Sequence, residues 1–186
     1  FGIVSRGIAT CIRHLGSDKA EEAARCAVSE SGEWLVGFGM AGDESFGRPK
    51  DYYSSFECAK EAGLKLTSHA GEWCGADSVR ATITELDVQR IGHGVQAITD
   101  KDLVEMIIDR QIALEICPGS NIFLGVYPNL LLHPIKKLRD QGVKVTISTD
   151  DPPFFRTTLN DEYLSLAKTF GWTDKDFIDL NLIALD

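Results

Sequence analysis

Three short segments of the sequence carry side chains that could bind a metal ion and move a proton. The segment SHAGE contains His69 and Glu72, and the segment RIGHG contains His93 between two glycines. A third segment, STDDPP, offers the adjacent carboxylates of Asp150 and Asp151. Neutral imidazole and carboxylate are zinc-compatible ligands, and a catalytic zinc ion lowers the pKa of a bound water to about 7. This set of residues therefore indicates metal-assisted hydrolysis.

The elements that must position these side chains are short apolar runs, each ending in polar or small residues. Their lengths suit buried strands, and nearly continuous apolar character is typical of a parallel sheet covered on both faces. His69, His93 and Asp150 all fall at the same end of successive predicted strands. The six predicted strands are Gly7–Ile12, Trp34–Met40, Leu64–Ser68, Arg90–His93, Ile112–Cys117 and Val143–Ser148.

Helix-like segments lie between and after the predicted strands. Asp18 and Glu21 have capping-box spacing, Asp77 is an N-cap candidate, and Thr99 with Asp102 suggests another helix start. These helix-like segments alternate with the predicted strands, and this alternation predicts βα units. The predicted helices are Asp18–Ser29, Pro49–Ala62, Asp77–Val88, Thr99–Arg110, His133–Gln141, Leu159–Thr169 and Thr173–Leu185.

Repeated strand-helix units predict an α/β fold, and the class we expect is a (β/α)8 TIM-type barrel. Such a barrel needs about 250 residues, and catalytic residues collect at the carboxyl ends of its strands. The 186 residues show only about six of the eight strand-helix units. We therefore expect residues 1–186 to form the C-terminal portion of one barrel domain, with the missing units before Phe1.

Composition excludes several classes of protein. Lys and Arg number 19 against 28 Asp and Glu, so the net charge is −9 and the surface repels a phosphate backbone. No apolar run approaches the roughly 20 residues needed to span a bilayer. The five cysteines form no C-x-x-C pair, which favours free thiols in a reducing compartment. We expect a cytoplasmic protein with no nucleic-acid or membrane partner.

The sequence resembles the adenosine deaminase family over essentially its whole length. The resemblance implies zinc-dependent hydrolytic deamination of adenosine, and also 2′-deoxyadenosine, to the inosine form and ammonia, with a small purine nucleoside as the ligand. It rests on five segments in the family's order and spacing. They are MAGDE at 40–44, SHAGE at 68–72, RIGHGV at 90–95, LEICPGSN at 114–121 and STDDP at 148–152.

The family pattern implies roles for four of these residues. His69 and Asp150 would be zinc ligands, Glu72 would protonate N1 of the purine, and His93 would orient the attacking hydroxide. A general acid must hold its proton near neutral pH, so we predict that burial raises the pKa of Glu72.

The same pattern implies that the Gly42 backbone faces N3 of the purine and that Asp151 binds on the N7 side. It also implies two further zinc ligands from a His-x-His pair, which this sequence lacks. We expect that pair upstream of Phe1, and we expect the 186 residues alone to bind zinc poorly and not to turn over. Adenine or an N6-methylated nucleotide is an alternative substrate, because the catalytic set would be shared.

Two other classes of function compete with this interpretation. The segment GFGMAG at 37–42 matches the dinucleotide fingerprint, but acidic residues and a proline follow it where a helix should begin. The zinc deaminases of cytidine type need H-x-E and P-C-x-x-C, and neither occurs. The missing His-x-His pair supports a catalytically silent binding protein. His133, before a proline, is predicted to be a surface residue at a helix start.

Overall fold

A parallel six-stranded sheet forms the centre of the computed structural model, which describes residues 4–185. The strands lie in the sheet in their order along the chain. Phe1 and Asp186, the expected limits of the domain, lie outside the described residues. The strands are β1 (Gly7–Ile12), β2 (Leu35–Ala41), β3 (Lys65–Ala70), β4 (Arg90–His93), β5 (Ala113–Ile116) and β6 (Lys144–Ile147).

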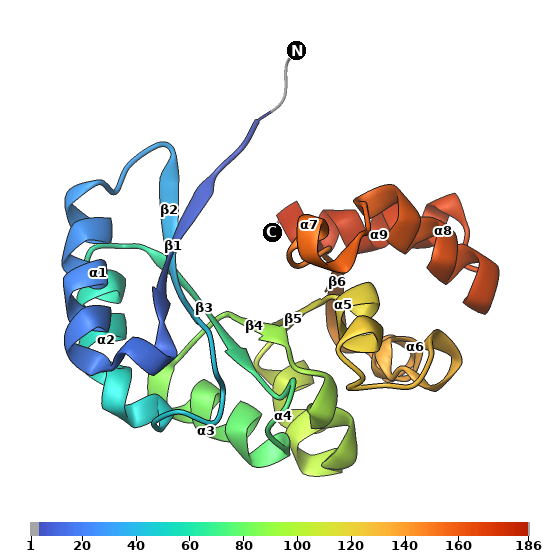
Figure 1. Cartoon of the computed structure of the whole chain (residues 1–186), viewed down its shortest axis with the longest axis horizontal. Helices are drawn as coiled ribbons and strands as arrows, with labels where there is room; N and C mark the ends of the chain where they lie inside the picture. The colour runs from blue at the N-terminus through green and yellow to red at the C-terminus, as the bar shows by residue number, and fades with distance from the viewer. Residues whose placement is uncertain (1–3, 186) are drawn as a thin grey trace.

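Helices follow the strands along the outside of the curved sheet (Figure 1). Helix α1 packs against β1 and α2, and the last helix, α9, packs against β6. The α-helices are α1 (Ser17–Ser29), α2 (Tyr53–Glu61), α3 (Ala76–Leu86), α4 (Lys101–Asp109), α5 (Pro118–Phe123), α6 (Ile135–Asp140), α7 (Pro152–Phe155), α8 (Leu159–Phe170) and α9 (Asp174–Leu185). The 3-10 helices are η1 (Arg13–Leu15), η2 (Pro49–Tyr52), η3 (Val95–Thr99) and η4 (Leu130–Leu132).

The predicted strands are confirmed, but the predicted helix starts are partly wrong. Helix α1 begins at Ser17, so Asp18 and Glu21 lie inside it and form no capping box. Asp77 lies in the first turn of α3 and does not cap it. Asp100, next to the predicted cap, accepts the N-terminal hydrogen bond of α4. A cap needs extended backbone just before the helix, and the strand-to-helix connections decide where that occurs.

Two short helices, α5 and α7, were absent from the predicted elements. Each has proline in its first turn, a position that proline favours because its missing N–H is not needed there. Helix α5 begins two residues after the end of β5 and α7 begins five residues after the end of β6. Helix α5 supplies side chains to the site described below. Their four to six residues are too few to show a helical periodicity in the sequence.

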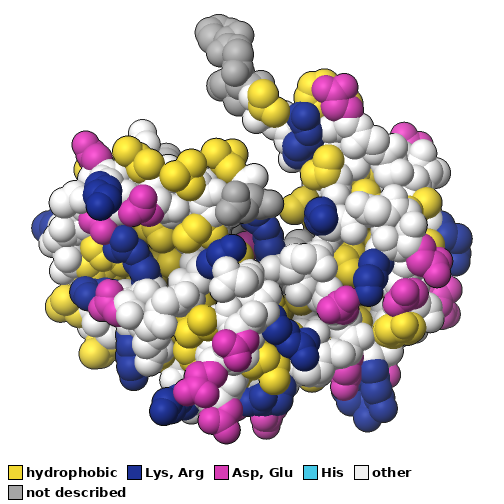
Figure 2. Space-filling view, turned by 180° about the vertical axis from the view of Figure 1, so that it is seen from behind, with side chains coloured by type: hydrophobic (Ala, Val, Ile, Leu, Met, Phe, Trp, Pro, Cys, Tyr) yellow, Lys and Arg dark blue, Asp and Glu magenta, His cyan; other side chains and the backbone are white. Residues whose placement is uncertain are grey.

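The core lies between the sheet and its covering helices. Phe38 of β2 meets Phe56 of α2 edge to face at 5.3 Å, and both are buried. The strand residues Ile91, Leu114 and Val145 have no exposed surface. Hydrophobic side chains gather on one face at the upper left of Figure 2, on the side of the C-terminal helices. Among residues 4–185, no helix is both long and apolar enough to cross a bilayer.

Candidate active site

Three of the predicted site residues meet at the carboxyl ends of β3, β4 and β6. His69 lies on β3 and His93 ends β4, and their rings pack edge to face with centroids 4.8 Å apart. Asp150 follows β6 and faces the same cavity of about 280 Å³. The residues that line this cavity are His69, Gly92, His93, Glu115, Cys117, Ser148, Thr149 and Asp150.

The backbone at two of these residues adopts a conformation that L-amino acids rarely use. His93 has φ 63° and Asp150 has φ 60°, in the left-handed region. Such a conformation costs about 1–3 kcal/mol and persists where surrounding structure enforces it, often at active sites. The two strand ends therefore turn sharply at the residues whose side chains enter the cavity.

Glu72 joins this group from the turn after β3. Its Oε2 lies 3.6 Å from Nε2 of His93, which in turn lies 3.9 Å from Oδ2 of Asp150. Burial, followed by the negative charges of Asp150 and Glu44, raises the pKa of Glu72 to about 7. The predicted rise in the pKa of Glu72 is thus confirmed, and its carboxyl group can carry a proton near neutral pH.

Glu44, to which the sequence assigned no role, holds the turn that carries Glu72. Its buried carboxylate accepts hydrogen bonds from the backbone N–H groups of Gly71, Glu72, Trp73 and Cys74. It also accepts one from the hydroxyl of Ser78, at 2.7 Å. Charge-assisted bonds of this kind are the stronger ones in proteins, so one side chain fixes the whole turn.

Asn121, on α5, is a second site residue without a role in the sequence interpretation. Its Nδ2 lies 3.4 Å from Oε1 of Glu72 and 3.2 Å from Nδ1 of His93, and its Oδ1 lies 3.1 Å from Nε2 of His133. The prediction that His133 is a surface residue is wrong, because only 3% of it is exposed. The ring of His133 packs on the ring of Tyr127, with the two ring centroids 5.0 Å apart.

Glu44 and Asn121 both lie inside segments that carried the family resemblance, MAGDE and LEICPGSN. Their place in those segments was the one signal in the sequence that could have identified Glu44 and Asn121 as site residues. His133 had none, because it stands alone before a proline and its partner is 12 residues away.

The two residues expected to bind the purine lie outside the cavity. Gly42 and Asp151 are both exposed, and neither lines the cavity between β3 and β6. Gly42 follows β2 with φ 97°, and a Cβ atom there would come within 2.9 Å of Nδ1 of His14. Their assignment as purine-binding residues stays a prediction.

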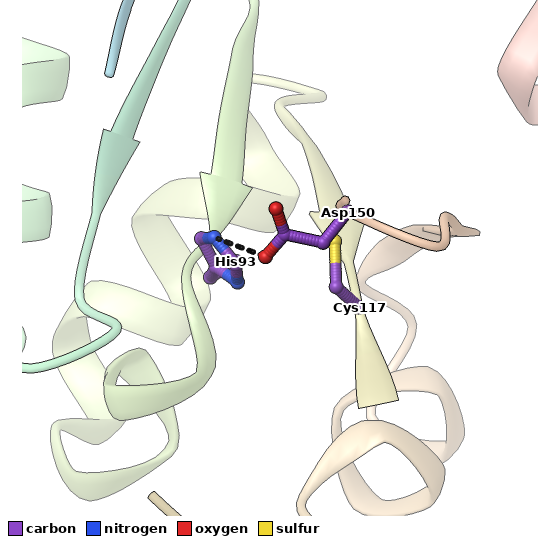
Figure 3. A group of neighbouring side chains, drawn as sticks. All are labelled: His93, Cys117 and Asp150. Atoms are coloured by element: carbon purple, nitrogen blue, oxygen red, sulfur yellow. Dashed lines mark ion pairs between the residues drawn. The ribbon is translucent and has the colours of Figure 1, made fainter. Parts of the chain in front are cut away.

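The donors on the cavity wall fit a metal ion in two possible combinations. His69 and Asp150 supply an imidazole and a carboxylate, the ligand types that zinc accepts. Ser120 donates to Oδ2 of Asp150 at 2.7 Å, which orients that carboxylate. A second combination consists of His93, Cys117 and Asp150, whose ligand atoms all lie within 4.8 Å of one another (Figure 3).

Chemistry favours the first combination. The buried thiol of Cys117 donates to the backbone carbonyl of Glu115, with 3.8 Å between sulfur and oxygen, and burial raises the pKa of that thiol above its ordinary value. We therefore retain His69 and Asp150 as the ligand pair that this chain could contribute.

A larger hollow, of about 650 Å³, lies among α5, α7 and α8. Its wall includes Gly119, Phe155 and Glu162 and none of the predicted site residues. Glu162 already accepts hydrogen bonds from Thr157 and from the backbone of Gly119. Volume alone does not make this hollow the reactive centre, because the convergent ionisable groups lie in the smaller cavity.

Comparison with known proteins agrees with this geometry. The adenosine deaminase family model matches residues 1–186. Adenine deaminases from Rhizobium rhizogenes and Rhizobium johnstonii are 47% and 48% identical over 185 residues, which cover 100% of this chain and 58% of each relative. The crystal structure of adenine deaminase from Arthrobacter aurescens superposes with a TM-score of 0.92 at 28% identity, covering 100% of this chain and 56% of that one.

The chain thus spans somewhat more than half the length of these relatives. The six strand-helix units correspond to part of a (β/α)8 barrel, as the sequence predicted.

Proposed function

Because the chain belongs to the adenosine deaminase family, we propose that it carries part of the active site of a zinc-dependent hydrolase. This hydrolase replaces the exocyclic amino group of adenine with oxygen and releases ammonia. The observation that carries the proposal is the meeting of His93, Glu72 and Asp150 at the carboxyl ends of β3, β4 and β6. Nε2 of His93 lies within 4 Å of both carboxylates there.

Adenine replaces adenosine as the substrate we propose. The sequence resemblance favoured adenosine and held adenine as the alternative. The two Rhizobium relatives, at 47% and 48% identity, are both named adenine deaminase. The Arthrobacter aurescens structure carries the same name. A free base needs no ribose contacts, so the partner we propose is a small purine base.

The chemistry can be divided among the residues of this chain. His69 and Asp150 would hold the metal ion together with ligands from outside this chain. When bound, such an ion would lower the pKa of a water molecule. Glu72 holds a proton near neutral pH and can donate it to a ring nitrogen of the purine. His93 is buried beside Glu72 and can hold the incoming oxygen by a hydrogen bond.

The test uses the full-length protein that contains this sequence, loaded with zinc. We expect ammonia release from adenine to exceed release from adenosine and from N6-methyl-AMP. Glu72→Gln should lower kcat by about 10²- to 10⁴-fold, because a positioned general acid contributes about that much. The matched control is Glu61→Gln at the exposed end of α2, which should leave kcat unchanged.

Two results would contradict the proposal. One is equal activity of the Glu72→Gln variant and the wild type. The other is ammonia release that persists at its full rate after a chelator has removed all bound metal. A different result is that adenosine proves the better substrate while Glu72→Gln still lowers kcat and the chelator still stops ammonia release. In that case the reaction stands and the substrate is corrected. A protein silent with all three purines would support the binding-protein alternative. The cytoplasmic location stays a prediction.

A further inference from the structure

We propose that a hydrogen-bond relay from the start of α6, through His133 and Asn121, holds His93 as the tautomer protonated on Nε2. In this relay Asn121 and His133 are positioning residues. The structural part of the inference is independent of the proposed function, whereas its consequence for catalysis rests on it.

The relay begins at the backbone N–H group of Ile135. The N–H of Ile135 points at Nδ1 of His133, with 3.2 Å between the nitrogens. A backbone N–H can only donate, so Nδ1 of His133 must accept and carries no proton. Burial lowers the pKa of His133 to about 4, so the ring is neutral at pH 7. Its single proton is therefore on Nε2.

The second step fixes the orientation of a side-chain amide. Nε2 of His133 lies 3.1 Å from Oδ1 of Asn121. The oxygen and the nitrogen of an amide occupy nearly equivalent positions, and their hydrogen-bond partners decide which atom faces which way. Because Nε2 of His133 donates, the amide atom facing it must be the oxygen. The Nδ2 group of Asn121 then points the other way, toward the cavity.

The third step transfers this polarity to His93. Nδ2 of Asn121 lies 3.2 Å from Nδ1 of His93 and 3.4 Å from Oε1 of Glu72. Its two protons match these two acceptors, and the fully buried amide has no water with which to exchange them. Nδ1 of His93 therefore accepts. An Nδ1 that accepts carries no proton, so the one proton of the His93 ring is on Nε2.

This tautomer decides what His93 can do. Its Nε2–H points to the space between Oε2 of Glu72, at 3.6 Å, and Oδ2 of Asp150, at 3.9 Å. In that state His93 donates a hydrogen bond to a bound oxygen and has no free lone pair on Nε2 with which to ligate a metal. The group drawn in Figure 3 is therefore not a set of three metal ligands. His93 serves as a fixed donor beside the site.

The direct test is a long-range 15N–1H spectrum of the full-length protein labelled with 15N-histidine, recorded at pH 7. The signals of His93 are identified by their loss in His93→Asn. We expect an unprotonated Nδ1 and a protonated Nε2 in His93, and the same pattern in His133. A protonated Nδ1 in His93 overturns the relay. This readout needs no catalytic turnover, so it can fail or succeed separately from the proposed function.

Two variants test whether the Asn121 amide determines the tautomer of His93. Asn121→Asp keeps the shape of the side chain but replaces the donor with an acceptor, so Nδ1 of His93 must become protonated. We expect that switch in the spectrum and a loss of kcat of at least about 10-fold with a smaller change in KM. His133→Phe is the second variant. It removes the group that orients the amide, and we expect the Nδ1 and Nε2 signals of His93 to broaden or exchange.

The matched control is Tyr127→Phe, which keeps the packing on His133 and removes only a hydroxyl at 3.4 Å from the carbonyl of Val95. It should leave the His93 signals unchanged. If Asn121→Asp folds and His93 keeps a protonated Nε2 alone, the relay is wrong. If it does not fold, the wild-type and His133→Phe spectra still decide. A His93 spectrum that is the same in His133→Phe and wild type overturns the role of His133.

Discussion

The carboxylate of Glu44 shows how one buried residue can serve both structure and chemistry. It accepts hydrogen bonds from four consecutive backbone N–H groups, those of residues 71–74. Those bonds fix the turn that carries Glu72, and the charge of Glu44 contributes to the raised pKa of Glu72. Removing that charge should therefore loosen the turn and also make the proposed acid a poorer proton carrier.

The variant Glu44→Gln tests this double role. A neutral amide accepts weaker hydrogen bonds than a carboxylate, and its NH2 group faces backbone donors. We expect the free energy of unfolding to fall by about 1–3 kcal/mol, the usual penalty for unsatisfied buried groups. Urea denaturation measures this effect, with the exposed Glu61→Gln as control. No loss of stability beyond that of the control would show that other contacts hold the turn.

At the level of elements, the register of β3 and β4 brings the candidate metal ligand into place. His69 pairs with Gly92 across the two strands. A Cβ atom on Gly92 would lie 2.5 Å from Cδ2 of His69, closer than real Cβ atoms approach. Only glycine leaves room for the imidazole ring against this strand.

Gly92→Ala should therefore displace the His69 ring. We expect zinc affinity to fall by about 10- to 100-fold, the usual effect of disturbing the support of a ligand. Competition with a chromophoric chelator on the full-length protein measures the change. Gly32→Ala is the control, because a Cβ there would meet nothing within 4 Å. Equal zinc affinity of Gly92→Ala and wild type would remove His69 from the ligand set.

At the scale of the whole molecule, the described part of the chain is an open sheet whose edge strands, β1 and β6, each have one strand neighbour. Figure 1 shows the two edges apart, with the C-terminal helices lying beside the β6 edge. A closed barrel has no such edges. We propose that residues 1–186 are the C-terminal portion of one barrel domain and that two further strand-helix units close it.

The stability of the molecule should depend on pH through its buried histidines. The folded-state pKa of His133, about 4, is below its ordinary value of 6.5 because burial disfavours the charged ring. Below pH 6.5 the unfolded chain binds a proton that the folded chain refuses. The stability contributed by neutral His133 is thus fully present above pH 6.5 and is lost as pH falls toward 4.

We expect this one group to lower the free energy of unfolding by roughly 2 kcal/mol between pH 6.5 and pH 5, at about 1.4 kcal/mol per pH unit. Urea denaturation at both pH values, for wild type and for His133→Gln, isolates the effect from that of the carboxylates. The variant should show the smaller pH dependence. Equal slopes would mean that His133 titrates normally in the folded state.

Much of the architecture could be predicted because it is written in local patterns. The strands β1 and β4 have their predicted bounds, and the others differ by one or two residues. Burial on both faces of a parallel sheet requires apolar runs, and these are visible in the sequence. The polar residues that follow them marked His69, His93 and Asp150 as neighbours at one end of the barrel.

Only the tertiary structure decided how these residues are supported. The partners of Glu44 lie 27 to 34 residues away along the chain, and those of Asn121 lie 12 to 49 residues away. The direction of the Asn121 amide, and with it the tautomer of His93, follows from a backbone N–H on α6. Hydrogen-bond polarity depends on which atoms meet in space, and periodicity along a chain carries no information about it.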